Sequence, residues 1–147
     1  MGHMDIIRRG ATIFDRLVVS VLQNPAKSPL FTIDERMEML HDACRGLENV
    51  EVRQFGGLLV AHARQMQARV VLKGLRIVSD FEYELQQAHF NRQLAPELDT
   101  VFLATESRNA FLSSSLVKEV ALLGGNVTGL VPQGVESKLT ERLREMG

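Results

Sequence analysis

Short apolar, β-branched runs alternate along the chain with longer stretches in which apolar residues recur every three or four positions. The short runs cover 16–22, 49–55, 68–74 and 99–105, and each has the length and composition of a β-strand. The periodic stretches have the spacing of amphipathic helices. This alternation predicts an α/β fold, with a parallel sheet and helices on both of its faces.

The helices expected from this periodicity cover 4–15, 32–45, 58–67, 79–94, 113–125 and 135–146. Two of them begin with the sequence of a capping box, Thr32 with Glu35 and Ser79 with Glu82. Cys44 continues the apolar face of helix 32–45, which predicts a core position rather than a reactive thiol.

Helix 79–94 carries apolar residues on more than one side. Phe81, Leu85 and Ala88 lie on one side, while Tyr83, Phe90 and Leu94 lie on another. A helix that is apolar on two sides is expected to contact a second subunit as well as the sheet.

Composition indicates one globular domain spanning 1–147, because the chain has 147 residues and is 45% hydrophobic. With 17 Lys and Arg against 18 Asp and Glu, it has no net basic field that would hold a nucleic acid or an anionic membrane. The sequence contains a single cysteine and no apolar run long enough to span a bilayer. These features predict a cytoplasmic location.

The order of elements raises a difficulty, because the chain begins on a helix. A doubly wound, Rossmann-like sheet should begin with a strand that leads into that helix. We therefore expect that the first, central strand is absent from this sequence, and that the native polypeptide carries roughly a dozen residues before Gly2. A chain that starts at Met1 should be poorly stable or take a strand from elsewhere, since two neighbouring strands would lack a partner.

Residues suited to anion binding are the clearest chemical signal. Ser113, Ser114 and Ser115 begin a predicted helix, where free backbone N–H groups and hydroxyls can form a phosphate site, although one serine could be only a helix cap. Lys73 and Arg76 lie at the carboxyl end of the third predicted strand, the edge where ligands bind in open α/β sheets.

Gly74 and Lys27 add to the expected anion site, whereas the histidines do not indicate a metal site. Gly74 allows a turn and a close approach of the backbone to a ligand, and Lys27 lies in a loop at the same expected edge. The histidines at 41, 62 and 89 have no metal-ligand spacing, so a zinc site is not expected. No spacing of a Ser-His-Asp triad or of paired carboxylates is visible, so the sequence favours phosphate binding over covalent catalysis.

These motifs together resemble those of bacterial phosphopantetheine adenylyltransferases, over essentially the whole chain. The resemblance is carried by "GHMDIIRRGATIFD", "NPAKSPLFTIDERMEML", "KGLRIVSDFEYELQQAHFNRQLAPEL", "TVFLA" and "FLSSSLVKEVALLGGNVTGLVP". It implies transfer of an adenylyl group from ATP to 4'-phosphopantetheine in coenzyme A biosynthesis, giving dephospho-coenzyme A and pyrophosphate. It also implies Mg²⁺ bound through the ATP phosphates, possible inhibition by coenzyme A, and a homohexamer.

The resemblance implies a role for each matching residue. His3 would contact the ATP phosphates as the histidine of a Thr-x-Gly-His motif, and Lys27 would bridge the reacting phosphates. Lys73 would hold the phosphate of phosphopantetheine, and Leu59 would line the pantetheine channel. The remaining matches are ATP contacts: Gly74, Leu75, Arg76, Glu84, Asn109, Ala110, Phe111, Leu112, Ser113, Ser114 and Ser115.

Two departures from the family pattern matter. Lys73 replaces the usual arginine, which keeps the charge but loses the planar fork that binds phosphate at two points. The strand and turn that carry the Thr of Thr-x-Gly-His are missing. Gly2 and His3 could be remnants of an expression tag, but their register with the motif and with the helix after it favours the motif.

Two readings of the function follow. The catalytic one needs His3, Lys27 and Arg76 only to align phosphates and neutralise charge, because the phosphate of phosphopantetheine is itself the nucleophile. The alternative is a catalytically impaired oligomer that binds nucleotide or coenzyme A, because the first strand and turn are missing. A nucleic-acid-binding role is disfavoured by the charge balance.

Overall fold

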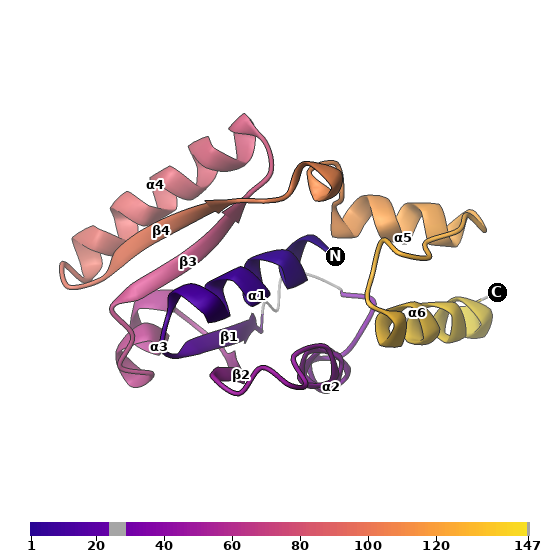
Figure 1. Ribbon diagram of the computed structural model, residues 1–147, viewed down its shortest axis with the longest axis horizontal. Helices are drawn as coiled ribbons and strands as arrows, with labels where there is room; N and C mark the ends of the chain where they lie inside the picture. Colours follow the sequence, from indigo (N-terminus) through magenta and orange to yellow (C-terminus); the bar gives the residue numbers. More distant parts are fainter. Residues whose placement is uncertain (24–28, 147) are drawn as a thin grey trace.

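A computed structural model describes residues 1–23 and 29–146, in which helices and strands alternate as the sequence predicts (Figure 1). The helices are α1 (Gly2–Ile13), α2 (Ile33–Ala43), α3 (Leu59–Gln65), α4 (Val78–Leu94), the short 3-10 helix η1 (Ser107–Asn109), α5 (Ser114–Leu122) and α6 (Gln133–Met146). The strands are β1 (Leu17–Leu22), β2 (Val50–Phe55), β3 (Val70–Leu75) and β4 (Asp99–Ala104). Every expected helix and strand is therefore present, with ends shifted by a few residues.

The strands pair in two separate parallel sheets. In the first, β1 pairs with β2 from Leu17↔Val50 to Leu22↔Phe55. In the second, β3 pairs with β4 from Val70↔Asp99 to Leu75↔Ala104. The α/β class is thus confirmed, but the four described strands do not form one continuous sheet, because each of them pairs with a single partner.

Helix α1 lies across both sheets. A Cβ placed on Gly10 would come within 2.6 Å of Leu72 Cδ2 in β3 and 3.3 Å of Leu17 Cδ2 in β1. One turn earlier, Ile6 Cγ1 would be 2.7 Å from a Cβ on Gly74. Since Gly10 is near the start of β1 and Ile6 near the end of β3, α1 runs opposite to the strands. Its N-terminus therefore lies at their carboxyl ends, beside η1 (Figure 1).

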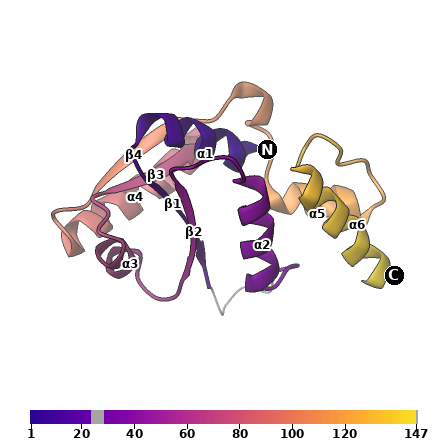
Figure 2. The same cartoon turned by 60° about the horizontal axis from the view of Figure 1, so that its bottom comes forward.

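Helices cover both faces of the strands, as expected for a doubly wound fold (Figure 2). On one face, Met4 and Ile7 of α1 pack with Cys44 and Val52. On the other face, α3 packs on β1, where Ser20 contacts His62, and α4 packs on β4, where the rings of Phe81 and Phe102 meet edge to face. Adjacent strand residues point to opposite faces, so each strand contributes to both layers.

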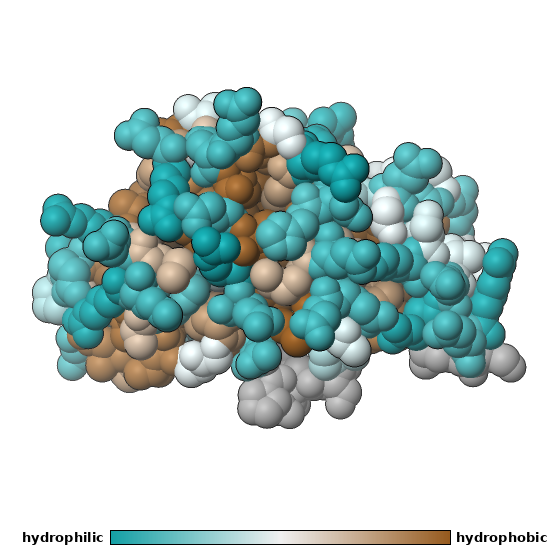
Figure 3. Space-filling view, turned by 90° about the horizontal axis from the view of Figure 1, so that it is seen from below, coloured by the Kyte–Doolittle hydropathy of each residue, from teal (hydrophilic) through white to brown (hydrophobic). Residues whose placement is uncertain are grey.

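Helices α5 and α6 form a pair beside the strands, toward which the N-terminus of α1 points (Figure 1). Val117 of α5 and Leu139 of α6 form the buried core of this pair, together with Leu112 before α5 and Val127 after it. Arg142 fixes α6 to the start of α2 through an ion pair with Glu35. In the space-filling view, apolar side chains reach the surface over the strand-containing part, whereas the α5–α6 end is largely hydrophilic on this face (Figure 3).

The two predicted capping boxes have different outcomes. At α2 the capping box is present, because Thr32 accepts from the Glu35 N–H and Glu35 accepts from the Thr32 N–H. At α4 the prediction of Ser79 with Glu82 is wrong. The N-cap of α4 is Ile77, and the carboxylate of Asp80 accepts the backbone N–H of Arg76 at 3.2 Å instead. The helix already begins at Val78, so Ser79 lies within its first turn and is not its N-cap, while Asp80 in the same turn interacts favourably with the helix dipole.

Two further predictions concern the core position of Cys44 and the two apolar sides of α4. Cys44 is buried in the core, as the periodicity predicts. Helix α4 packs through Phe81 on β4 and leaves Tyr83, Phe90 and Leu94 exposed on its other side. None of the described helices is long and apolar enough to cross a membrane.

His62 of α3 is buried against Ser20 and Phe55. We expect it to make the free energy of unfolding depend on pH. Its Nε2 lies 2.8 Å from Ser20 Oγ, and the Phe55 ring stacks on it with centroids 4.4 Å apart. Burial lowers the pKa of His62 below its usual value. The unfolded chain, with a histidine pKa of about 6.5, therefore takes up a proton before the folded chain does.

Lowering the pH from 7 to 5 should thus reduce the free energy of unfolding, by up to about 1.4 kcal/mol per pH unit from this residue. Urea unfolding at both pH values measures the effect, and His62→Phe should lessen the dependence because phenylalanine has no proton to bind. His41→Gln is the matched control, since His41 is exposed. An equal pH dependence in wild type and His62→Phe would contradict the assignment.

Candidate functional site

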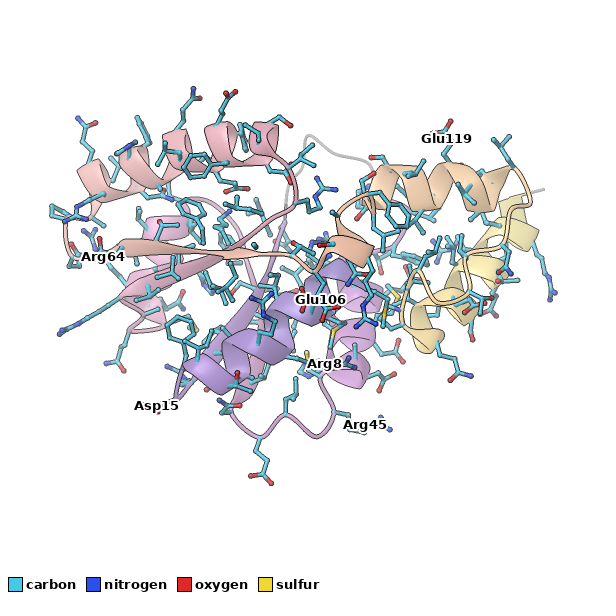
Figure 4. All side chains as sticks on the ribbon, turned by 45° about the horizontal axis from the view of Figure 1, so that its top comes forward. Arg8, Asp15, Arg45, Arg64, Glu106 and Glu119 are labelled. Atoms are coloured by element: carbon cyan, nitrogen blue, oxygen red, sulfur yellow. The ribbon has the colours of Figure 1, made fainter. Side chains whose placement is uncertain are left out.

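Three segments meet at the carboxyl ends of the strands. They are the first turn of α1, the end of β3, and the segment that links β4 to α5. A Cβ on Gly2 would lie 3.7 Å from Thr105 Cγ2 and 3.9 Å from Asn109 Cβ. Asp5 Oδ2 accepts the backbone N–H of Glu106 at 3.0 Å, and Figure 4 shows Glu106 beside α1. The start of α1 is therefore held against the segment that precedes α5.

His3 is the second residue of α1 and has an exposed side chain. Desolvation of the covered part of the ring lowers the pKa of His3, and the positive charge of Arg76 lowers it further. Gly2, next to His3, lies against Thr105 and Asn109, and Arg76 donates to the Leu112 carbonyl, so both residues adjoin the segment that precedes α5. A mainly neutral imidazole in this position can donate one hydrogen bond to an anionic ligand.

Arg76 follows β3 and joins two parts of the site. Its Nε and Nη2 donate to the two carboxylate oxygens of Asp80 at 3.0 Å and 3.1 Å. Its Nη1 donates to the backbone carbonyl of Leu112 at 2.6 Å. A guanidinium has five N–H donors, so one hydrogen on each terminal nitrogen remains for a ligand. The side chain is about one-third exposed, which leaves it accessible from solvent.

The segment Asn109 to Ser115 closes one side of the site. Asn109 and Leu112 are buried, Ala110 is half-buried, and Phe111 is exposed. Ser113 is the N-cap of α5, since its hydroxyl accepts the Leu116 N–H at 3.1 Å. Ser114 and Ser115 are exposed at the start of the helix. One serine is thus a cap, and the other two offer hydroxyls and backbone N–H groups to an anion.

Lys73 and Glu84 form a second, adjoining pair. The Nζ of Lys73 lies 3.0 Å from Glu84 Oε2. This oxygen is fully buried and its geometry with Lys73 is not that of a hydrogen bond, so the contact is one of charge attraction. Lys73 is expected to bind phosphopantetheine and Glu84 to contact ATP, yet the structure places the two side chains together. Gly74 and Leu75 connect Lys73 to Arg76 along β3.

One expected residue, Leu59, is not part of this cluster. Leu59 is the half-buried first residue of α3, after β2, and thus belongs to the end of the other sheet. Lys27 lies outside the described residues. Among residues 1–23 and 29–146, no group of three or more His, Cys, Asp or Glu side chains could hold a metal ion.

The arrangement suits a polyanion that carries several phosphate groups. It offers the N-termini of two helices, α1 and α5, and the cations Lys73 and Arg76, all beside the carboxyl ends of parallel strands. Helix N-termini and basic side chains bind phosphate through backbone N–H groups and charge. A phosphate-binding edge at the carboxyl ends of parallel strands is typical of the nucleotide-binding class of α/β proteins.

Comparison with known proteins identifies the family. The cytidylyltransferase-like family model matches residues 1–120. A phosphopantetheine adenylyltransferase of Gloeobacter violaceus is 56% identical over 141 residues, which is 96% of this chain and 88% of the relative. Another, from Caldanaerobacter subterraneus subsp. tengcongensis, is 51% identical over 98% of this chain and 90% of the relative. The chain belongs to the cytidylyltransferase-like nucleotidyltransferases and, within them, to the phosphopantetheine adenylyltransferase family.

Sequence reasoning missed one residue of the site, Asp80. It assigned the start of α4 to a serine cap and gave Asp80 no role. A signal was nonetheless present, because Arg76 and Asp80 are four positions apart at the start of a helix, a spacing at which opposite charges pair.

Proposed function

We propose that this chain, as one domain over 1–147, transfers the adenylyl group of ATP to 4'-phosphopantetheine. The products are dephospho-coenzyme A and pyrophosphate, and the reaction is a step in coenzyme A biosynthesis. The observation that carries the proposal is the meeting of His3, Arg76 and the start of α5 beside Lys73, at one end of the strands. Two neighbouring cationic positions suit two phosphorylated substrates that react with one another.

The chemistry requires alignment and charge neutralisation. A phosphate oxygen of phosphopantetheine attacks the α-phosphorus of ATP, and the bond from that phosphorus to the β-phosphate oxygen breaks, which releases pyrophosphate. In this proposal Lys73 holds the attacking phosphate, Lys27 bridges the reacting phosphates and Leu59 lines the pantetheine channel. His3, Arg76 and the N-terminus of α5 bind the ATP phosphates. No protein side chain forms a bond to a substrate, so no general base is needed.

Magnesium fits this proposal as a partner of ATP rather than of the protein. Asp80 and Glu84 are already paired with Arg76 and Lys73, and the described carboxylates form no metal-binding group. We therefore expect Mg²⁺ to be bound through the ATP phosphates, where it supplies positive charge to phosphate oxygens. Coenzyme A, which contains both substrate moieties, is proposed as an inhibitor that occupies the same site.

Pyrophosphate release tests the proposed function. Purified protein with ATP, Mg²⁺ and 4'-phosphopantetheine should release pyrophosphate and form dephospho-coenzyme A, detected by mass spectrometry. Reactions with pantetheine, which lacks the phosphate nucleophile, are the matched control. Binding of ATP without any turnover would instead support the alternative, a catalytically impaired nucleotide-binding oligomer, which the named relatives do not favour.

We further propose that the exposed side of α4 contacts other copies of the chain, in a homohexamer. Tyr83 is 60% exposed and Phe90 62% exposed on the side of α4 that faces away from β4. Exposed aromatic side chains gathered on one helix face are typical of subunit contacts.

Phe90→Glu should therefore shift the protein to smaller species, since it places a charge in the proposed contact. Sedimentation equilibrium measures the change. Leu123→Glu is the control, because Leu123 is 82% exposed on another part of the surface. A monomeric wild type, or an unchanged distribution for Phe90→Glu, would contradict the proposed contact.

A further inference from the structure

Asp80 contacts Arg76 through both of its carboxylate oxygens. Its two carboxylate oxygens accept from Nε and Nη2 of Arg76, at 3.0 Å and 3.1 Å, and Oδ2 also accepts the Arg76 backbone N–H at 3.2 Å. Such a paired, charge-assisted contact fixes the plane of a guanidinium as well as its position. The Asp80 side chain is less exposed than that of Arg76, at 22% against 34%, so the carboxylate supports the cation from the protein side.

The contact extends from Asp80 to the start of α5. Arg76 Nη1 donates to the carbonyl of Leu112 at 2.6 Å, and Leu112 is buried one residue before the N-cap Ser113. Asp80, Arg76 and Leu112 thus link the first turn of α4 to the helix whose N-terminus faces the site. The Asp80 carboxylate and the residue just before the N-cap of α5 therefore contact the same guanidinium.

We propose that Asp80 is a positioning residue for ATP: it holds the Arg76 guanidinium so that its two free N–H groups, together with the start of α5, meet the ATP phosphates. This inference rests on the proposed function and adds a residue to it. The Arg76 guanidinium also keeps the pKa of the Asp80 carboxyl below its usual range, so Asp80 remains charged at neutral pH.

Steady-state kinetics on a double-mutant cycle tests the proposal. Asp80→Asn should lower kcat/KM for ATP by about tenfold or more, because a small misplacement of a positioning group is costly. The KM for phosphopantetheine should change by less than about twofold. In the Arg76→Ala background, Asp80→Asn should have no further effect, since its action requires Arg76. Asp80→Glu, which keeps the charge, should recover part of the loss.

The cycle separates positioning from simple capping. Asparagine retains an oxygen that can accept a backbone N–H, so the melting temperature of Asp80→Asn should stay close to that of wild type. Equal losses with and without Arg76 would overturn the proposal and leave Asp80 as a cap. Tighter ATP binding by Asp80→Asn would also overturn it, because Asp80 would then compete with ATP for Arg76.

A matched control is the exposed Asp42–Arg45 pair, with 2.7 Å between its charged groups, where Asp42→Asn should leave kinetics unchanged. Failure of the proposed function is recognised separately, since wild type would then release no pyrophosphate. In that case calorimetric titration of wild type and Asp80→Asn with ATP still decides the role of Asp80: a tenfold weaker affinity supports it, and an equal affinity overturns it.

Discussion

Replacing His3 by alanine is expected to lower kcat by about a hundredfold to a thousandfold, the usual cost of removing one donor that stabilises developing charge. His3 lies at the start of α1, in the neighbourhood of Arg76, and crowding together with nearby positive charge lowers its pKa. The hydrogen bond from such a donor strengthens as negative charge grows on the phosphates during bond breaking. The loss should therefore fall on kcat more than on ATP affinity.

Single-turnover measurements and calorimetric titration with ATP would separate these two effects. His3→Asn is the informative control, because the amide keeps a neutral donor and should retain part of the rate. His89→Ala, on the exposed surface of α4, should have no such effect on kcat. A kcat for His3→Ala within about threefold of wild type would remove His3 from the proposed mechanism.

Replacing Lys73 by alanine is expected to raise the KM for phosphopantetheine by about tenfold or more, since a charged contact to a phosphate contributes about 1.5 to 3 kcal/mol. The structure gives a second reason to expect a higher KM for phosphopantetheine. Without Lys73, the buried Oε2 of Glu84 loses the cation that lies 3.0 Å from it. An unpaired carboxylate in the site would repel an incoming phosphate, which increases the loss for this substrate.

Lys73→Arg should be tolerated or should improve phosphopantetheine binding, because a guanidinium can bind phosphate at two points while retaining the pair with Glu84. The double variant Lys73→Ala/Glu84→Gln removes both charges and should recover part of the binding lost in Lys73→Ala. Titration with each substrate measures the affinities. Equal losses for ATP and phosphopantetheine in Lys73→Ala would assign Lys73 to a different role.

Much of the fold could be predicted because its determinants are local. Strand runs, helical periodicity, the Thr32 capping box and the Ser113 N-cap depend on residues a few positions apart, and each is present in the structure. The expected gathering of Lys73, Arg76 and the serines at one edge followed from a general rule, that the carboxyl ends of parallel strands meet. The roles of these residues remain predictions.

Tertiary structure decided which charges are paired. Glu84 meets Lys73, and Arg76 meets the Leu112 carbonyl, only because α4 packs over β3 and the segment before α5 returns to the same edge. Neither sequence separation nor residue type specifies such contacts. The contact of Asp80 with Arg76, by contrast, is local, because the two residues are four positions apart.

By itself, then, the sequence determined the local elements, the family motifs and the types of charge at the strand ends, because these depend on neighbouring residues. The pairing of those charges depends on distances between elements that are far apart along the chain, such as the 36 positions between Arg76 and Leu112. Only the packed structure sets those distances. In the packed structure, Asp80 and the Leu112 carbonyl hold the Arg76 guanidinium, and Glu84 pairs with Lys73.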